Sequence, residues 1–194
     1  MTRVFHPFGE FLPPGATKMI VGTFPAAQFT GKECQGQARA GDIEFFYGGT
    51  RNGLWPLLSE CFGVSMRTVS EIKALLTARK IAVGDVVRSC VRINCSSLDK
   101  DLKEIEWNND LATTLREKQI ETLLFTGLTA QKWFRRNIVK DARFREVVLP
   151  SPAPAALISL SRTTDCKIWM SEKSGRRPKD FRLHIYETIL GSLE

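Results

Sequence analysis

The sequence predicts an α/β protein with three layers, α/β/α, in which helices cover both faces of a central, mostly parallel four-stranded sheet. Short apolar runs alternate with amphipathic helical segments along the 194 residues, and this order is typical of parallel strands joined by helical crossovers. The length is also one that a single domain commonly has. We therefore expect residues 1–194 to form one domain.

Four runs have the length and composition of buried strands. The first, 18–23 (KMIVGT), ends just before Pro25, which cannot donate a hydrogen bond to a sheet. The others are 81–87, 120–126 and 144–149. Ligands of parallel α/β sheets bind beyond the carboxyl ends of the strands. The ends of these four runs should therefore share one edge, and a ligand site is expected there.

The segments between and after these strands are mostly helical in pattern. We expect helices at 52–63, 68–79, 107–118, 127–138 and 181–193. The stretch 26–44 has no period and is expected to be a long loop of the kind that often carries function. The basic stretch 167–179 is expected to be a surface loop.

The charge balance favours a polyanionic partner. The chain has 28 Lys and Arg against 21 Asp and Glu, a net charge of +7, which suits DNA, RNA or anionic lipid. The start of the chain lacks the apolar run of a signal peptide, and no run approaches the roughly 18 residues of a membrane span. We expect a cytoplasmic protein of bacterial type, associated with the nucleoid, that does not bind membranes.

The cysteines and histidines do not form a metal-binding pattern. The five cysteines contain no Cys-x-x-Cys pair and there are two histidines, whereas structural zinc and iron–sulfur sites need tighter clusters. We expect no metal and no cofactor, and we expect the cysteines to be small buried apolar residues.

Two segments are rich in Gly, Pro and Ser and lie at or near predicted strand ends. The first joins GTFPA (22–26) to FFYGGTRNGLWPLL (45–58), and the second is LPSPAPA (149–155). Gly allows a ligand to approach the backbone closely, and Pro fixes the path of the backbone. Each segment alone is equally consistent with a tight turn that binds nothing, but their predicted meeting at one sheet edge favours a ligand site.

In this order the motifs resemble the uracil-DNA glycosylase superfamily, and within it the branch of hypoxanthine-DNA and mismatch-specific uracil glycosylases. The matching residues are Gly22-Thr-Phe-Pro25, Phe45-Phe-Tyr47, Arg51-Asn52-Gly-Leu-Trp55, Asp85-Val-Val-Arg-Ser-Cys90 and Leu149-Pro-Ser-Pro-Ala-Pro-Ala155. The resemblance implies a glycosylase-like α/β/α fold and hydrolysis of the N-glycosidic bond of a deaminated base, uracil or hypoxanthine, that has been flipped out of DNA.

The resemblance also implies which residues bind the base. Phe46 is expected to stack on it, with Phe45 or Tyr47 as alternatives because the pattern does not settle the register, and Phe24 is expected to line the pocket. Asp85 stands where relatives place an Asn or Asp that faces the base, and an ionised carboxylate accepts hydrogen bonds from a ring N–H. The alternative for Asp85 is a carboxylate that caps a backbone turn.

Catalysis is where the chain departs from its relatives. Many of them carry Asp, Asn or Glu directly after the motif glycine, where this chain has Thr23 and Phe24. Some carry a His at the place of Leu149. The resemblance leaves Asn52 to handle the attacking water, with Thr23 assisting. Asn52 is alternatively a helix N-cap, and both roles can coexist.

The remaining candidates are expected to bind DNA. Ser151 and Ala153 lie in the second motif, where hydroxyl and backbone N–H groups can bind a phosphate or the base. The cationic candidates are Arg51, Lys132, Arg135 and Arg136. The helical ones are alternatively an ordinary solvated face.

Three functions remain at this point. The first is a DNA glycosylase of base excision repair that binds damaged DNA as a monomer. The second is a catalytically weak or inactive DNA-binding relative. The third, a small hydrolase or nucleotide-binding domain, is disfavoured because the chain has no Gly-x-Ser-x-Gly, P-loop or Gly-x-Gly-x-x-Gly motif.

Overall fold

A computed structural model describes residues 2–31, 34, 38–139 and 144–192. Part of the predicted loop 26–44 (residues 32–33 and 35–37) and the end of the predicted last helix (residue 193) lie outside the described residues. In the described part of the chain, no helix is long and apolar enough to cross a membrane.

The central sheet has four parallel strands in the order β3-β2-β6-β7. The strands are β2 (Lys18–Gly22), β3 (Ile81–Asp85), β6 (Thr122–Phe125) and β7 (Arg145–Val148). All four predicted strands are therefore present, and the α/β class is confirmed. Every residue of β3 and β6 is buried, as expected for strands covered on both faces.

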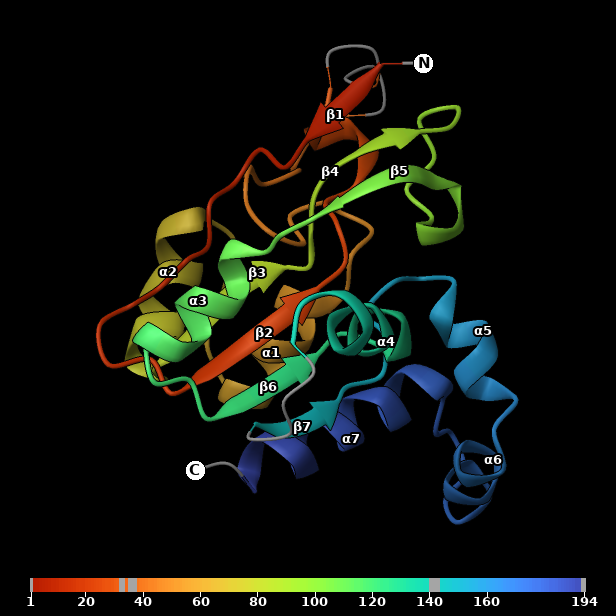
Figure 1. The fold of residues 1–194 in the computed structure, drawn as a ribbon. Coiled ribbons are helices and arrows are strands. Elements are labelled where there is room, and N and C mark those ends of the chain that lie inside the picture. The colour runs from red at the N-terminus through yellow and green to blue at the C-terminus, as the bar shows by residue number, and fades with distance from the viewer. Residues whose placement is uncertain (1, 32–33, 35–37, 140–143, 193–194) are drawn as a thin grey trace.

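Helices cover the two faces of this sheet (Figure 1). Alternate strand residues such as Ile20 and Leu124 pack in one apolar cluster with side chains of α1 (Leu54–Phe62), α2 (Val69–Ala78) and α7 (Pro178–Gly191). Their neighbours Met19, Val21, Leu123 and Phe125 pack in a second cluster with α3 (Asp110–Glu117) and α4 (Leu128–Asn137). The period of two along each strand thus builds two cores, one on each side.

A second sheet was not predicted. It is antiparallel, in the order β1-β4-β5, and consists of β1 (Arg3–Phe5), β4 (Val87–Arg92) and β5 (Leu102–Trp107). The expected single strand 81–87 is wrong at its end, because the chain leaves the central sheet at Val86 and enters the second sheet. A single residue, Val86, separates the two strands in the sequence, so no proline or loop marks the change of sheet.

The C-terminal region is more helical than predicted. The prediction of a surface loop at 167–179 is wrong over its first half, where α6 (Thr164–Ser171) lies, preceded by the short α5 (Ala156–Ser161). Thr163 caps α6 by accepting the N–H of Cys166. The Arg176 guanidinium stacks 3.9 Å from the centre of the Trp169 ring, and this contact folds the following turn onto the helix.

Two cysteines do not behave as predicted. Cys34 and Cys95 form a disulfide that links the segment after the 3₁₀ turn Ala27–Phe29 to the β4–β5 loop. Cys90 and Cys166 are free and buried, as expected of small apolar residues, and Cys61 is free and half-buried. The bridge joins cysteines 61 positions apart, a pairing that sequence spacing alone does not reveal.

Candidate functional site

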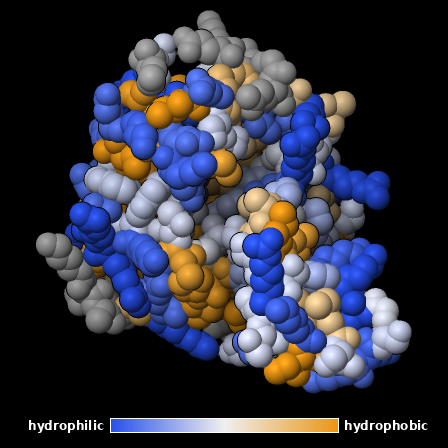
Figure 2. Space-filling model, turned by 90° about the vertical axis from the view of Figure 1, so that its right-hand side faces the viewer, coloured by the Kyte–Doolittle hydropathy of each residue, from blue (hydrophilic) through white to orange (hydrophobic). Residues whose placement is uncertain are grey.

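The carboxyl edge of the central sheet is hollowed into a cavity of about 1010 Å³. Figure 2 faces this edge, toward which the four strands of Figure 1 point, and shows a hollow bordered by both hydrophilic and hydrophobic side chains. The turns near residues 23, 52, 85 and 151 all line it. The expectation that these sequence-distant turns meet at one rim agrees with this geometry.

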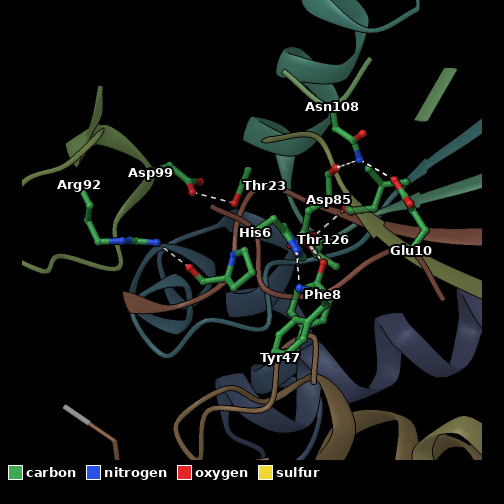
Figure 3. Close-up of polar contacts among 12 residues, drawn as sticks. His6, Phe8, Glu10, Thr23, Tyr47, Asp85, Arg92, Asp99, Asn108 and Thr126 are labelled. Atoms are coloured by element: carbon green, nitrogen blue, oxygen red, sulfur yellow. Dashed lines mark hydrogen bonds and ion pairs between the residues drawn. The ribbon is translucent and has the colours of Figure 1, made fainter. Parts of the chain in front are cut away.

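Asp85, at the end of β3, forms part of the cavity wall and is held by His6 from the β1 segment (Figure 3). Its side chain is 5% exposed, and its Oδ2 lies 2.9 Å from His6 Nε2. Phe8 donates its backbone N–H to His6 Nδ1, so Nδ1 carries no proton. His6 therefore donates from Nε2 to Asp85, an assignment that follows from this network.

The other carboxylate oxygen of Asp85 has no hydrogen-bond partner among the described residues, although it is buried. A Cβ placed at Gly22 would lie 2.4 Å from this Oδ1 and 2.1 Å from the hydroxyl oxygen of Tyr47. Glycine is therefore required at position 22, and it allows the carboxylate and the phenol to come together. A buried polar atom without a partner in a native structure calls for an explanation, and a ligand is one.

Tyr47 adopts an uncommon backbone conformation to reach this place. Its φ is 56°, in the left-handed region that is strained for bulky residues and concentrated at functional sites. Its hydroxyl lies 3.1 Å from Thr126 Oγ1. Burial, together with the nearby charge of Asp85, raises the pKa of the Tyr47 phenol well above its usual value, so the group stays protonated and can donate.

A second carboxylate in the cavity belongs to Asp99, in the 3₁₀ turn Asp99–Asp101 of the β4–β5 loop. Asp99 Oδ1 accepts a 2.7 Å hydrogen bond from the Thr23 hydroxyl (Figure 3). Burial raises the pKa of the Asp99 carboxyl above its usual value. The hydrogen bond from Thr23 opposes the rise and the charge of Asp85 adds to it.

Arg92 fixes the two segments that carry Thr23 and Asp99. Its guanidinium donates 2.7 Å to the Pro25 carbonyl and also to the Ser96 carbonyl. It lies 5.3 Å from the centre of the Phe24 ring. Burial lowers the pKa of the guanidinium, but arginine remains charged in proteins.

Asn52 lines the cavity directly before α1. Its Oδ1 accepts the N–H of Leu54 at 2.9 Å, although the N-cap position itself is occupied by Gly53. The expected helix-capping contact is therefore present, one residue earlier than the N-cap. With its oxygen bound to the helix, Asn52 has its amide N–H groups to offer to the cavity.

Helix α7 holds the second motif in place. Arg182 is 7% exposed and donates to the carbonyls of Ser151 and Ala153 at 3.2 and 3.5 Å. The Tyr186 hydroxyl donates to the Pro150 carbonyl at 2.8 Å. The basic and aromatic last helix thus orients the loop that closes one side of the cavity.

Most of the residues proposed from the sequence line this cavity. They are Thr23, Phe24, Tyr47, Arg51, Asn52, Asp85, Ser151 and Ala153.

Four other proposed residues lie elsewhere. Phe46, expected to stack on the base, is 1% exposed and packs on His6, Phe8 and Phe45. It does not line the large cavity but lines a smaller one with His6 and Asp85. Phe24 and Phe29 line the large cavity instead. The remaining three, Lys132, Arg135 and Arg136, are exposed on α4 and do not line the cavity, and Arg135 pairs with Glu146.

Sequence reasoning missed His6, Arg92 and Asp99 at this site. Their place depends on β1 and on the β4–β5 hairpin, the second sheet that the periodicity did not reveal. Among the described residues, no group of three or more His, Cys, Asp or Glu side chains is arranged to hold a metal ion.

No protein-family model matches the chain, and no curated protein matches it. Among solved structures, it is similar to an NMR structure from Methanosarcina acetivorans named a "putative Uracil DNA glycosylase". The TM-score is 0.57 and the identity 16%, over 95% of this chain and 98% of the other. The chain therefore has a uracil-DNA-glycosylase-like α/β fold, with its cavity at the carboxyl edge of the parallel sheet.

Proposed function

We propose that this chain is a DNA glycosylase that flips a deaminated base, uracil or hypoxanthine, out of DNA and hydrolyses its N-glycosidic bond. The observation that carries the proposal is the buried Oδ1 of Asp85, a residue of the cavity wall, which has no partner among the described residues. A ring N–H of the flipped base supplies the missing donor. Uracil and hypoxanthine both present such an N–H on the pairing edge.

The same oxygen explains how cytosine and adenine, the parents of the deaminated bases, are refused. The equivalent ring nitrogens of cytosine and adenine are bare acceptors, and an acceptor placed against a carboxylate leaves both groups unpaired. An unsatisfied buried acceptor costs about 1–3 kcal/mol. Deamination converts this acceptor into a donor, and His6 keeps Asp85 from turning away because it already binds Oδ2.

The rim of the cavity suits the DNA backbone. The exposed residues Arg39 and Arg51 line it, and so do residues 128–130 of the first turn of α4, whose N–H groups lack partners within the helix. Ser151 adds a hydroxyl on the facing loop. Lys132, Arg135 and Arg136 lie further along α4. The last two are roughly 10 Å beyond its start, so they can contact flanking phosphates but not the flipped nucleotide.

A strand-cleavage assay tests the proposal. Oligonucleotides that contain uracil, hypoxanthine or xanthine are incubated with the protein and then treated with alkali, which breaks the strand at each abasic site. We expect breaks at uracil or hypoxanthine, none in the lesion-free duplex, and a rate lowered by Asn52→Ala. Its melting temperature, measured in parallel, separates loss of chemistry from loss of folding.

One observation favours the alternative of a DNA-binding relative without activity. Leu149, at the place where some relatives carry a His, is 1% exposed and belongs to the apolar core, so no imidazole at this position stabilises a leaving base. Tight, salt-sensitive binding to lesion DNA with no breaks on any of the three bases would favour this alternative and contradict the glycosylase.

A further inference from the structure

We infer that Asp99 is the catalytic base of the proposed hydrolysis: its free carboxylate oxygen takes a proton from the attacking water, which the Thr23 hydroxyl helps to hold. This inference rests on the proposed function and assigns a residue that none of the glycosylase-like motifs contains. It concerns the reaction step for which those motifs supply no carboxylate.

The geometry around Thr23 leaves one oxygen of Asp99 available. Thr23 donates to Oδ1 at 2.7 Å, and no other described residue donates a hydrogen bond to this carboxylate. Because its proton is committed to Asp99, the Thr23 oxygen can accept a hydrogen bond from a water in the cavity. That water can give its second proton to Oδ2, and its lone pair is then free to attack carbon.

The other polar groups of the cavity are less suited to this role. Asp85 and Asp99 are the two carboxylates among the described residues that line it. Asp85 has one oxygen bound to His6 and the other beside Tyr47, where the base is read. Asn52 cannot take a proton, and its oxygen is bound to Leu54.

The loop that carries Asp99 is held firmly, as a catalytic position requires. Arg92 ties Ser96 and Pro25 together through their carbonyls. Ser97 Oγ accepts the N–H of Ala27 at 2.9 Å. The disulfide fixes the start of the same loop at Cys95. Three separate contacts thus hold this loop against the segment that follows Thr23.

The reaction balances without a further reactant. The water oxygen forms a bond to the anomeric carbon, the carbon–nitrogen bond breaks, and its electron pair leaves with the base. The water proton moves to Asp99 and is then released to solvent, and the base anion is protonated. The products are the free base and an abasic sugar.

The surroundings of Asp99 tune it as a base. Burial raises the pKa of its carboxyl, and the charged groups that face it are Asp85 at the end of β3 and Arg92 at the end of β4, with Lys100 and Asp101 in its own turn. A raised pKa makes a carboxylate a stronger proton acceptor, provided that the pH stays above it. Excision should therefore fall on acidification through this pKa, which lies above the ordinary value of 3.8.

The test compares Asp99→Asn with Asp165→Asn, the same change at an exposed carboxylate in the first turn of α6 that does not line the cavity. Single-turnover excision is measured across pH, and affinity is measured on a lesion analogue with a 2′-fluorinated sugar that resists hydrolysis. We expect Asp99→Asn to lose about 100-fold or more in rate, to lose the acid limb of the pH profile, and to keep its affinity. Asp165→Asn should keep both the excision rate and the acid limb of the pH profile.

Stability gives a readout independent of activity. A carboxylate whose pKa is raised in the fold stabilises the protein at low pH and loses that contribution as pH rises through the folded pKa. Asp99→Asn should therefore melt above the unmodified protein near pH 8, and the difference should vanish near pH 3. A carboxylate that stabilises the fold in its ionised form has a lowered pKa, and its replacement by Asn would give the opposite change.

The outcomes separate this inference from the proposed function. An unmodified protein that cuts lesion DNA, together with an Asp99→Asn variant that cuts equally fast or keeps the acid limb, overturns the role of Asp99 and leaves the glycosylase intact. Binding without cutting by the unmodified protein overturns both.

Discussion

At the residue scale, the site depends on one oxygen of Asp85 and on what surrounds it. His6 determines which oxygen is available, Tyr47 stands beside that oxygen, and Gly22 makes room for both. A single substitution at Asp85 or at Gly22 changes this geometry in a defined way, so its effect on activity can be predicted.

Replacing Asp85 by Asn should change which bases are accepted. His6 donates to the Asn oxygen, so the new NH₂ group faces the base in place of a bare oxygen. A ring N–H then meets a donor, and excision of uracil or hypoxanthine should fall about 5- to 150-fold, the equivalent of 1–3 kcal/mol. Competition binding with oligonucleotides that present cytosine or adenine in a mismatch should show a relative gain. An unchanged preference among these bases would show that Asp85 does not read the pairing edge.

Replacing Gly22 by Ala should damage the site while the fold survives. The new methyl would lie 2.1 Å from the Tyr47 oxygen and 2.4 Å from Asp85 Oδ1, so both groups must move. Overpacking of this kind costs about 1–3 kcal/mol of folding stability. The excision rate should fall by a factor that corresponds to at least the same free energy. Gly9→Ala is the matched control, because its methyl would meet nothing within 4 Å. Equal activity in the two variants would be incompatible with the geometry described.

At the scale of elements, the small antiparallel sheet delivers groups that the parallel sheet lacks. The β1 segment brings His6 to Asp85, and the β4–β5 loop brings Asp99 to Thr23. The disulfide anchors that loop from outside the sheet, so its integrity should affect both stability and chemistry.

Replacing both Cys34 and Cys95 by Ser should lower the free energy of unfolding by about 2–4 kcal/mol, the range typical of lost disulfides. The excision rate should also fall, since Asp99 lies four positions after the bridge. Thermal melts with and without a reducing agent check this: the reductant should lower the melting temperature of the unmodified protein and leave the double variant unchanged. A reductant without effect on either protein would argue against the bridge.

At the scale of the whole molecule, the positive charge should appear in how salt affects DNA binding. Each neutralised phosphate contributes a slope of about −0.9 to log affinity against log salt. Arg51→Ala, at the cavity rim, should weaken binding to any sequence and reduce the slope by about one unit. Lys118→Ala is the control, because Lys118 follows α3 at the opposite edge of the sheet. Titrations between about 50 and 200 mM salt that give both variants the same slope would place the DNA elsewhere.

The central sheet was predictable because its strands are continuous apolar runs separated by helical periods. The second sheet was not, because β1 has three residues and a single residue, Val86, separates β4 from β3, so no loop marks the change of sheet. The residues of the site also fall into a predictable and an unpredictable group. Thr23, Asn52, Asp85 and Ser151 follow from the strand-end rule and from the motifs, whereas His6 and Asp99 depend on pairings between distant segments. Phe46 was misplaced by register, since adjacent rings of an aromatic run point to different surroundings.

Two of the contacts that shape the cavity come from nearly opposite ends of the sequence. His6 orients the Asp85 carboxylate, and Arg182 with Tyr186 holds the loop around Ser151. A polypeptide is made from its amino terminus, so during synthesis the parallel sheet can form well before helix α7 leaves the ribosome. A nascent chain stalled short of that helix would therefore have strands and a partial core but no properly shaped pocket, and the ability to bind a ligand there would arrive only with the last helix.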